Sequence, residues 1–192
     1  MIRLDCSDPA YANQLDALFE RSAFDEQVER EVAGILAEVR RRGDAALSHY
    51  VRVFDQANLA PAEFRVPDDE IAQAADALDS KQKAAIRDAC RQVRDFAAQR
   101  IPKLWSYAPR KGVVLGERFA PLSRVGAYVP GGTAPLVSSV IHTVCLASTA
   151  RVPEIAMVTP PQADGRVHPA LLYAADQAGA TEIFRLGGVY AI

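Results

Sequence analysis

The sequence predicts an α/β fold in which a mostly helical N-terminal region precedes a partial Rossmann-like parallel sheet, an incomplete doubly wound unit. Helical apolar spacing dominates the first part of the chain. After Pro102, short apolar strands alternate with helical segments. Because helices and strands that segregate along a chain indicate separate layers or regions, we expect a helical region at residues 1–110. A hairpin and a βαβαβ unit should occupy residues 111–192.

Helices in the N-terminal region are marked by start and stop residues. Pro9 stands where a helix reaching Phe19 would begin, since proline is favoured at the first helical position. A longer helix should span about residues 25–42, because its apolar residues recur at three- and four-residue steps. Gly43 ends it. Further helices are predicted to start at Asp44, Pro67 and Ser80.

The second half of the chain has the pattern of a parallel sheet. Residues 112–119 and 124–129 are strand-like, and the short connection between them favours an antiparallel hairpin. Strands at 125–129, 155–158 and 183–186 then alternate with helices at 136–149 and 169–178. The strand starts lie roughly 30 residues apart, the length of a βαβ unit. We therefore expect three parallel strands with right-handed crossovers, an edge strand and an uncovered face.

A glycine turn follows the first of these strands. The strand beginning at Arg124 runs into Gly131 and Gly132, and a helix follows from Pro135. Such a junction exposes backbone N–H groups at the positive end of a helix, where a phosphate binds. The two glycines are expected to supply the positive φ of a tight turn and to let the phosphate approach. A second strand–glycine turn ends the chain at 186–192.

Charge and composition exclude several classes of function. The formal net charge of −2 gives no electrostatic reason to bind nucleic acid or a membrane surface. No apolar stretch approaches the roughly 20 residues of a membrane span. The three cysteines show no CxxC spacing, which indicates a reduced, cytoplasmic setting.

Metal and nucleophile motifs are absent from the sequence. His49, His142 and His168 lie far apart and form no HxH or HxxxH pair, so we expect no metal site from them. Ser138 and Ser139 have no GxSxG context and no neighbouring base. We expect no serine nucleophile.

Four segments resemble the histidinol dehydrogenase family. Arg-Arg-Gly-Asp-Ala-Ala-Leu at 41–47, followed by Tyr50 and Phe54-Asp55, resembles its N-terminal helical signature. Residues 121–132 are similar to its central motif, which contains Tyr-Val-Pro-Gly-Gly. Val-Thr-Pro-Pro at 158–161 resembles the end of the family's next strand, and the glycine-containing segment 171–192 resembles the segment after that strand. The resemblance covers nearly the whole chain but only the N-terminal part of the family's longer sequence.

This resemblance implies an oxidoreductase of histidine biosynthesis that oxidises L-histidinol to L-histidine with NAD and a bound zinc. The tyrosine of the central motif corresponds to Tyr128, and a cofactor-contacting glutamine of the family falls on Tyr190. With Gly131 and Gly132, these are the expected cofactor-binding residues. Tyr190 departs from the family's pattern, because tyrosine offers one hydroxyl where glutamine offers an acceptor and two donors.

The family's catalytic Glu-His pair and zinc ligands match no position of this chain, so no catalytic or metal residue is assigned. Three hypotheses are open. The chain is a truncated N-terminal part, inactive alone, that acts on a small amino alcohol only when a C-terminal half completes it. Alternatively, it is a nucleotide- or anion-binding module without catalysis, or a module that covers its open sheet edge by forming a homodimer.

Overall fold

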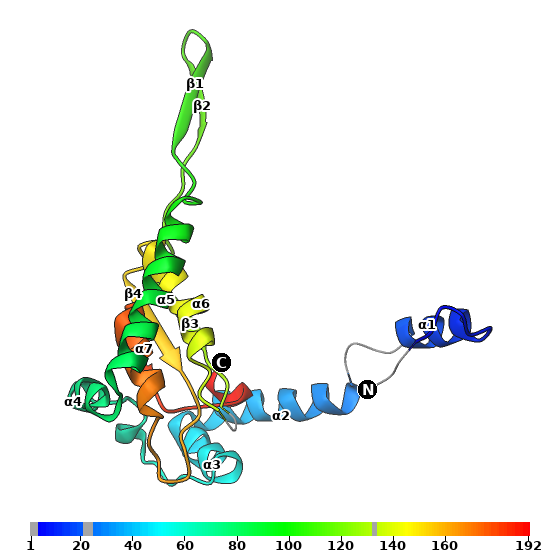
Figure 1. The fold of residues 1–192 in the computed structure, drawn as a ribbon, viewed down its shortest axis with the longest axis vertical. Helices are drawn as coiled ribbons and strands as arrows, with labels where there is room; N and C mark the ends of the chain where they lie inside the picture. The colour runs from blue at the N-terminus through cyan, green and yellow to red at the C-terminus, as the bar shows by residue number, and fades with distance from the viewer. Residues whose placement is uncertain (1–3, 21–24, 132–133) are drawn as a thin grey trace.

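The fold was taken from a computed structural model, which describes residues 4–20, 25–131 and 134–192. Figure 1 shows the chain. In order, its elements are α1 (Tyr11–Phe19), α2 (Glu26–Arg42), α3 (Asp44–Phe54), η1 (Pro61–Glu63), α4 (Asp68–Gln73), η2 (Ala74–Ala77), α5 (Ser80–Ala98), β1 (Trp105–Arg110), β2 (Val113–Glu117), β3 (Arg124–Tyr128), α6 (Val137–Thr149), β4 (Glu154–Val158), α7 (Pro169–Ala178), β5 (Glu182–Phe184) and η3 (Val189–Ala191). The elements labelled η are 3-10 helices.

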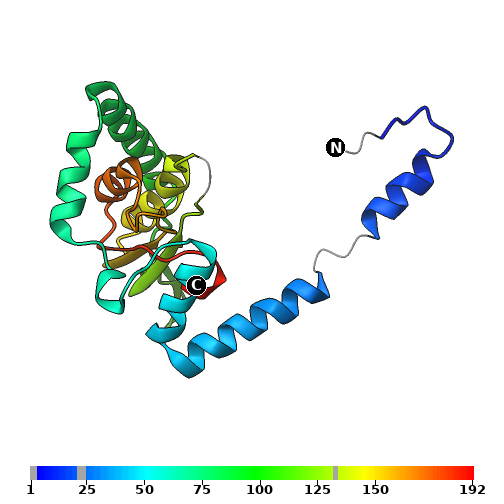
Figure 2. The same ribbon diagram turned by 90° about the horizontal axis from the view of Figure 1, so that it is seen from below.

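The predicted parallel sheet is confirmed. Its strand order is β3-β4-β5, and both neighbouring pairs are parallel. Helices α6 and α7 are the two crossovers, and α5 packs against both of them. Figure 2 shows these three helices gathered on one side of the sheet. The α/β class, with helices first and a partial Rossmann-like sheet second, is therefore the observed fold.

The main core lies between the sheet and these three helices. Ile155 and Met157 point from the central strand β4 into it and are fully buried. Alternate residues of a strand face opposite sides, so Glu154 and Ala156 lie on the other face, where they are exposed and half-buried. Cys90 of α5 meets Cys145 of α6 inside the same core, and both are free thiols. This core explains the apolar spacing of β4 and α6.

A second, smaller core joins the N-terminal helices to the end of the chain. Val51 of α3 is fully buried in it, together with Leu186 and Tyr190 from the segment after β5. The rings of Tyr50 and Tyr190 stack with their centroids 5.8 Å apart. This cluster places the end of α3 beside the carboxyl end of the sheet.

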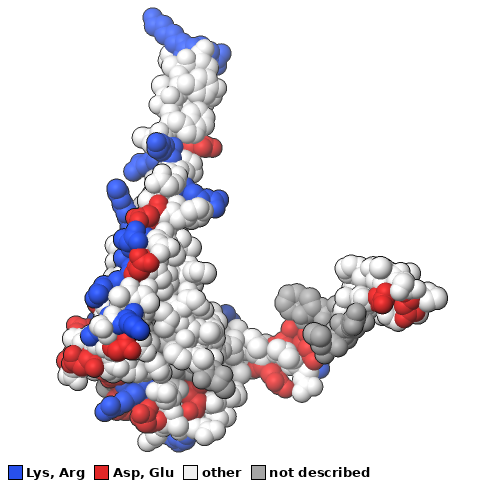
Figure 3. Space-filling view, viewed as in Figure 1, with Lys and Arg blue, Asp and Glu red and all other residues white. Residues whose placement is uncertain are grey.

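The predicted hairpin has a different partner. Strand β2 pairs antiparallel with β1, whereas β3 pairs with β4, so residues 112–119 and 124–129 do not form the hairpin. Gly112, with φ +82°, makes the tight turn after Lys111. The sequence prediction missed strand β1 because it contains Pro109, and proline is disfavoured within sheets. Pro109 lies where the register between β1 and β2 is irregular. The hairpin projects from the molecule, with charged side chains at its tip and few along its sides (Figures 1 and 3).

Helix starts agree with the sequence except at the first helix. Asp25 caps α2, and its side chain accepts the Gln27 N–H, as expected for a helix starting there. Helix α1 begins at Tyr11 rather than at Pro9. The Asp8 side chain accepts the Ala10 N–H at 2.8 Å and holds the preceding residues in a turn.

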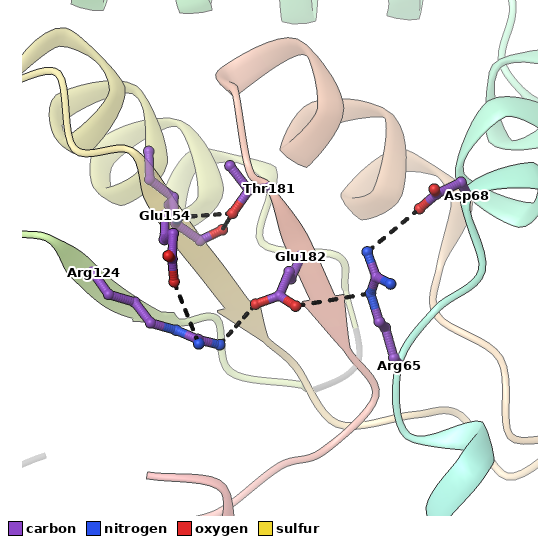
Figure 4. Close-up of polar contacts among 7 residues, drawn as sticks. Arg65, Asp68, Arg124, Glu154, Thr181 and Glu182 are labelled. Atoms are coloured by element: carbon purple, nitrogen blue, oxygen red, sulfur yellow. Dashed lines mark hydrogen bonds and ion pairs between the residues drawn. The ribbon is translucent and has the colours of Figure 1, made fainter.

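An ion network lies at the amino end of the sheet (Figure 4). Arg124 of β3 lies 3.4 Å from Glu154 of β4 and 2.7 Å from Glu182 of β5. Arg65 lies 4.0 Å from Glu182 and 3.8 Å from Asp68. These charges join the three strands on the face opposite α5, α6 and α7.

No helix in the described parts of the chain is long and apolar enough to cross a bilayer.

Helix α5 belongs to the predicted N-terminal region but packs on α6 and α7. A boundary at residue 110 therefore stays a prediction.

Candidate functional site

A cavity of about 530 Å³ opens at the carboxyl end of the sheet, where the segments after β3, β4 and β5 meet. Ligands of open α/β sheets bind at this end, and the volume is typical of a small-molecule site. The cavity is lined by Asp55, Tyr128, Pro130, Gly131, Ala134, Pro135, Thr159, Pro160, Pro161, Gln162, His168, Leu171 and Gly188.

A second hollow, of about 420 Å³, lies beside the start of β5 and carries the acidic residues Asp68, Asp176 and Glu182. It lies at the amino end of the strands, away from the edge where such sheets bind ligands. The larger cavity is therefore the candidate site.

Two of the four expected cofactor residues line this cavity. Tyr128 ends β3 and is 36% exposed, and Gly131 follows three residues later. Gly132 lies outside the described residues. Tyr190 is 4% exposed and does not line the cavity. The structure thus brings Tyr128 and Gly131 together and places Tyr190 behind the cavity wall.

Two hydrogen bonds of its hydroxyl hold Tyr190 in this position. Its hydroxyl donates to Oδ2 of Asp55, and it accepts the Gly187 N–H at 3.1 Å. Burial raises the pKa of the Tyr190 hydroxyl, and the Asp55 carboxylate raises it further. Burial also raises the pKa of Asp55, an effect that the hydrogen bond from Tyr190 partly opposes. Because Asp55 lines the cavity, Tyr190 reaches the site through that carboxylate.

The structure contradicts one of the two roles expected of Gly131, the positive φ, and the approach of a phosphate stays a prediction. The φ of Gly131 is not among the positive values of the described glycines, so it does not supply a left-handed turn. A Cβ on Gly131 would lie 2.4 Å from Cγ of Pro160, and one on Gly187 would lie 2.4 Å from Cβ of the same proline. Pro160 is therefore packed between two glycines, and close approach of the backbone is what requires them.

Thr159 is a polar residue of the cavity that the sequence did not single out. It follows β4 directly, is fully buried, and its backbone N–H donates to the Phe184 carbonyl at 3.1 Å. Within the described part of the chain, its Oγ1 has no hydrogen-bond partner. Buried hydroxyls are normally paired, so this oxygen needs an explanation.

His168 lines the cavity as the N-cap of α7. Its Nδ1 accepts the Ala170 N–H at 3.1 Å. A ring nitrogen that accepts is not protonated, so the proton of the neutral imidazole is on Nε2, which is a donor. His49 and His142 lie on α3 and α6 and do not line the cavity.

The described residues offer no ligand set for zinc. No three His, Cys, Asp or Glu side chains among them lie close enough together to hold a metal ion.

Sequence reasoning missed four lining residues with polar side chains: Asp55, Thr159, Gln162 and His168. Asp55 and Thr159 both lay within segments of the family resemblance, which could have pointed to them. His168 had only one local signal, the proline after it that marks a helix start.

Comparison with known proteins decides the family. The family model described as histidinol dehydrogenase matches residues 19–192. The chain belongs to the histidinol dehydrogenase family.

Its relatives in this family are much longer. "Histidinol dehydrogenase 2" of Trichormus variabilis is 39% identical, over 100% of this chain and 45% of the relative. Histidinol dehydrogenase of Gloeobacter violaceus is 41% identical, over 87% of this chain and 38% of the relative. The crystal structure of histidinol dehydrogenase from Elizabethkingia anophelis superposes with a TM-score of 0.82 at 30% identity, covering 89% of this chain and 39% of that one. The chain thus spans less than half the length of these relatives.

Proposed function

We propose that this chain supplies the nucleotide-binding part of a histidinol dehydrogenase and binds NAD in the cavity at the carboxyl end of its sheet. One observation carries the proposal. Tyr128, which matches the tyrosine of the family's central motif, lines a cavity formed where three parallel strands end. That position is where doubly wound sheets bind dinucleotides.

The cavity walls suit a planar, partly charged ligand. Tyr128 offers a half-exposed ring, and Pro130, Pro160 and Pro161 offer flat apolar surfaces beside it. Thr159 offers a hydroxyl that lacks a partner within the described chain. When bound, NAD accepts a hydride from the substrate, and the protein binds and orients it.

Tyr190 contributes as a positioning residue in this proposal. Its hydroxyl donates to Asp55 and accepts from Gly187, and the side chain is buried outside the cavity lining. It fixes the Asp55 carboxylate and the Gly187-Gly188 turn, both at the cavity wall.

Calorimetric titration of the chain with NAD tests this proposal. Saturable binding is expected, with a large loss of affinity in Tyr128→Ala. The matched control is Tyr107→Ala, which removes an exposed tyrosine of the hairpin strand β1. No binding to the folded wild type, or equal losses in both variants, would contradict the proposal.

Oxidation of histidinol, or of a related amino alcohol, is proposed only for the chain combined with the rest of a relative's sequence. The experiment mixes the chain with a separately produced C-terminal part of a relative and follows NADH formation. NADH from the mixture but not from either part supports a split dehydrogenase. If NAD binds and no NADH forms in a complex of the two parts, the alternative of a nucleotide-binding module without catalysis is favoured.

We also propose a homodimer, in the cytoplasm. The hairpin exposes large apolar side chains that a partner would cover: Trp105, Tyr107, Val114 and Leu115. Three free cysteines accord with a reducing compartment. Sedimentation velocity tests the dimer, and a folded monomer at micromolar concentration contradicts it.

A further inference from the structure

We propose that Thr159 and His168 form an anion subsite in this cavity that holds a phosphate group of the nucleotide. The inference rests on the proposed nucleotide binding and goes further, because it names the residues and the part of the ligand that they recognise. Both residues follow the central strand β4, one at its end and one at the start of the next helix.

The Thr159 hydroxyl is the first observation. It is fully buried among cavity-lining residues, and no described protein group bonds to Oγ1. The backbone N–H of Thr159 already donates to the Phe184 carbonyl. Because an unpaired buried hydroxyl is disfavoured, a ligand atom in the cavity would stabilise it as a partner. A phosphate oxygen accepts from such a donor.

The histidine is the second, independent observation. Because Nδ1 of His168 accepts the Ala170 N–H, the protonated nitrogen of its neutral ring is Nε2. His168 therefore presents a donor and has no free acceptor on that ring. Donors without acceptors select an anion.

Two helix N-termini reinforce this preference. Helix α7 begins directly after His168, and α6 begins beside Pro135, which also lines the cavity. The N-cap of α6, Leu136, has no side-chain acceptor to bond the first N–H groups. The positive ends of both helices therefore favour an anion between them.

One lining group opposes an anion. Asp55 is the only carboxylate among the described lining residues, and its Oδ2 is bound by the Tyr190 hydroxyl. It comes from the end of α3 rather than from the β4–α7 connection. A ribose hydroxyl can donate to a carboxylate at this kind of site, which directs the phosphate toward Thr159 and His168.

Calorimetric titration with ADP and with adenosine tests the subsite, since only ADP carries phosphate. The variants are Thr159→Val, which removes the hydroxyl and keeps the branched shape, and His168→Asn, which keeps an N-cap acceptor. Each should lower ADP affinity about tenfold, roughly one hydrogen bond to a charged group, and leave adenosine affinity unchanged. Thr159→Ser, which keeps the hydroxyl, should retain ADP affinity.

Thr149→Val is the matched control, since it removes a hydroxyl that bonds the Cys145 carbonyl at the far end of α6. Overlaid amide NMR spectra verify that each variant is folded. Equal losses for ADP and adenosine, or no preference of the wild type for ADP, would overturn the subsite.

Inorganic pyrophosphate separates failure of the subsite from failure of nucleotide binding. If NAD and adenosine do not bind but pyrophosphate shifts the Thr159 and His168 amides, and Thr159→Val abolishes this, the subsite stands and the nucleotide proposal fails. If NAD binds with an affinity that neither variant changes, the nucleotide proposal stands and the subsite is wrong. If neither pyrophosphate nor ADP binds, the subsite is also wrong.

Discussion

The hydroxyl of Tyr190 donates a hydrogen bond to the carboxylate of Asp55, and this contact joins the end of the chain to the end of α3. The two residues are 135 positions apart. The same hydroxyl accepts the Gly187 N–H. One side chain thus fixes both the second glycine turn and a carboxylate of the candidate site.

Removing that hydroxyl should destabilise the fold. Tyr190→Phe leaves the Asp55 carboxylate and the Gly187 N–H without their partner, and unpaired buried polar groups cost about 1–3 kcal/mol. Urea unfolding should show a loss of this size. Tyr107→Phe, at an exposed tyrosine, is the control and should change stability little. Equal effects of the two substitutions would mean that the Asp55 contact does not form.

Asp55 should make stability depend on pH. Burial raises its pKa in the folded state, above the ordinary value of about 3.9. As the pH rises through that value, the unfolded chain releases its proton before the folded chain does. The free energy of unfolding therefore falls from about pH 3.9 until the folded pKa is passed.

The measurement is urea unfolding of wild type and Asp55→Asn between acidic and neutral pH. The wild type should lose stability relative to the variant as the pH rises through this window. A difference that stays constant, or one that changes in the opposite direction, would show that the pKa of Asp55 is not raised.

The regular part of the fold was accessible from the sequence for a physical reason. Residues of β4 and α6 repeat with the period of their own secondary structure, because each buries one face against the same core. Local spacing therefore predicted the parallel sheet. The hairpin partner was missed because Pro109 breaks the strand pattern while Gly112 makes the turn.

The candidate site was only partly predictable. Tyr128 and Gly131 follow a strand in a recognisable motif, so they could be named in advance. Asp55 is far in sequence from the other lining residues, and its position at the cavity depends on how α3 packs. The missing partner of Thr159 is a property of its three-dimensional surroundings, which no local pattern encodes.

Pro160 should make alanine costly at its two neighbouring glycines. A Cβ at Gly131 or at Gly187 would meet Pro160 at 2.4 Å, and overpacking of this kind costs about 1–3 kcal/mol. Thermal or urea unfolding of Gly131→Ala measures this loss of stability. Gly126→Ala is the matched control, because a Cβ there meets nothing within 4 Å.

Adding Pro160→Ala to Gly131→Ala should recover part of the loss, because it removes the atom that clashes. The double variant should therefore be more stable than the sum of the single effects. Strict additivity would place the cause of the glycine requirement elsewhere.

A buried ion pair should contribute more to the free energy of unfolding than an exposed one. Glu70 bonds Arg185, a buried arginine, at 2.8 Å, whereas Glu154 meets Arg124 at an exposed position. Glu70→Ala leaves a buried charge unpaired and should cost on the order of 3 kcal/mol, somewhat less because Glu70 is partly exposed. Glu154→Ala should cost below about 1 kcal/mol. Similar losses in urea unfolding would contradict this difference.

The central claim, that NAD occupies the cavity at the carboxyl end of the sheet, is tested most directly by amide NMR during titration with NAD. Shift changes should concentrate at Tyr128, Gly131 and Thr159 and saturate, while the hairpin amides stay unchanged. A spectrum that does not change at high NAD concentration, or changes confined to residues far from the cavity, would contradict it.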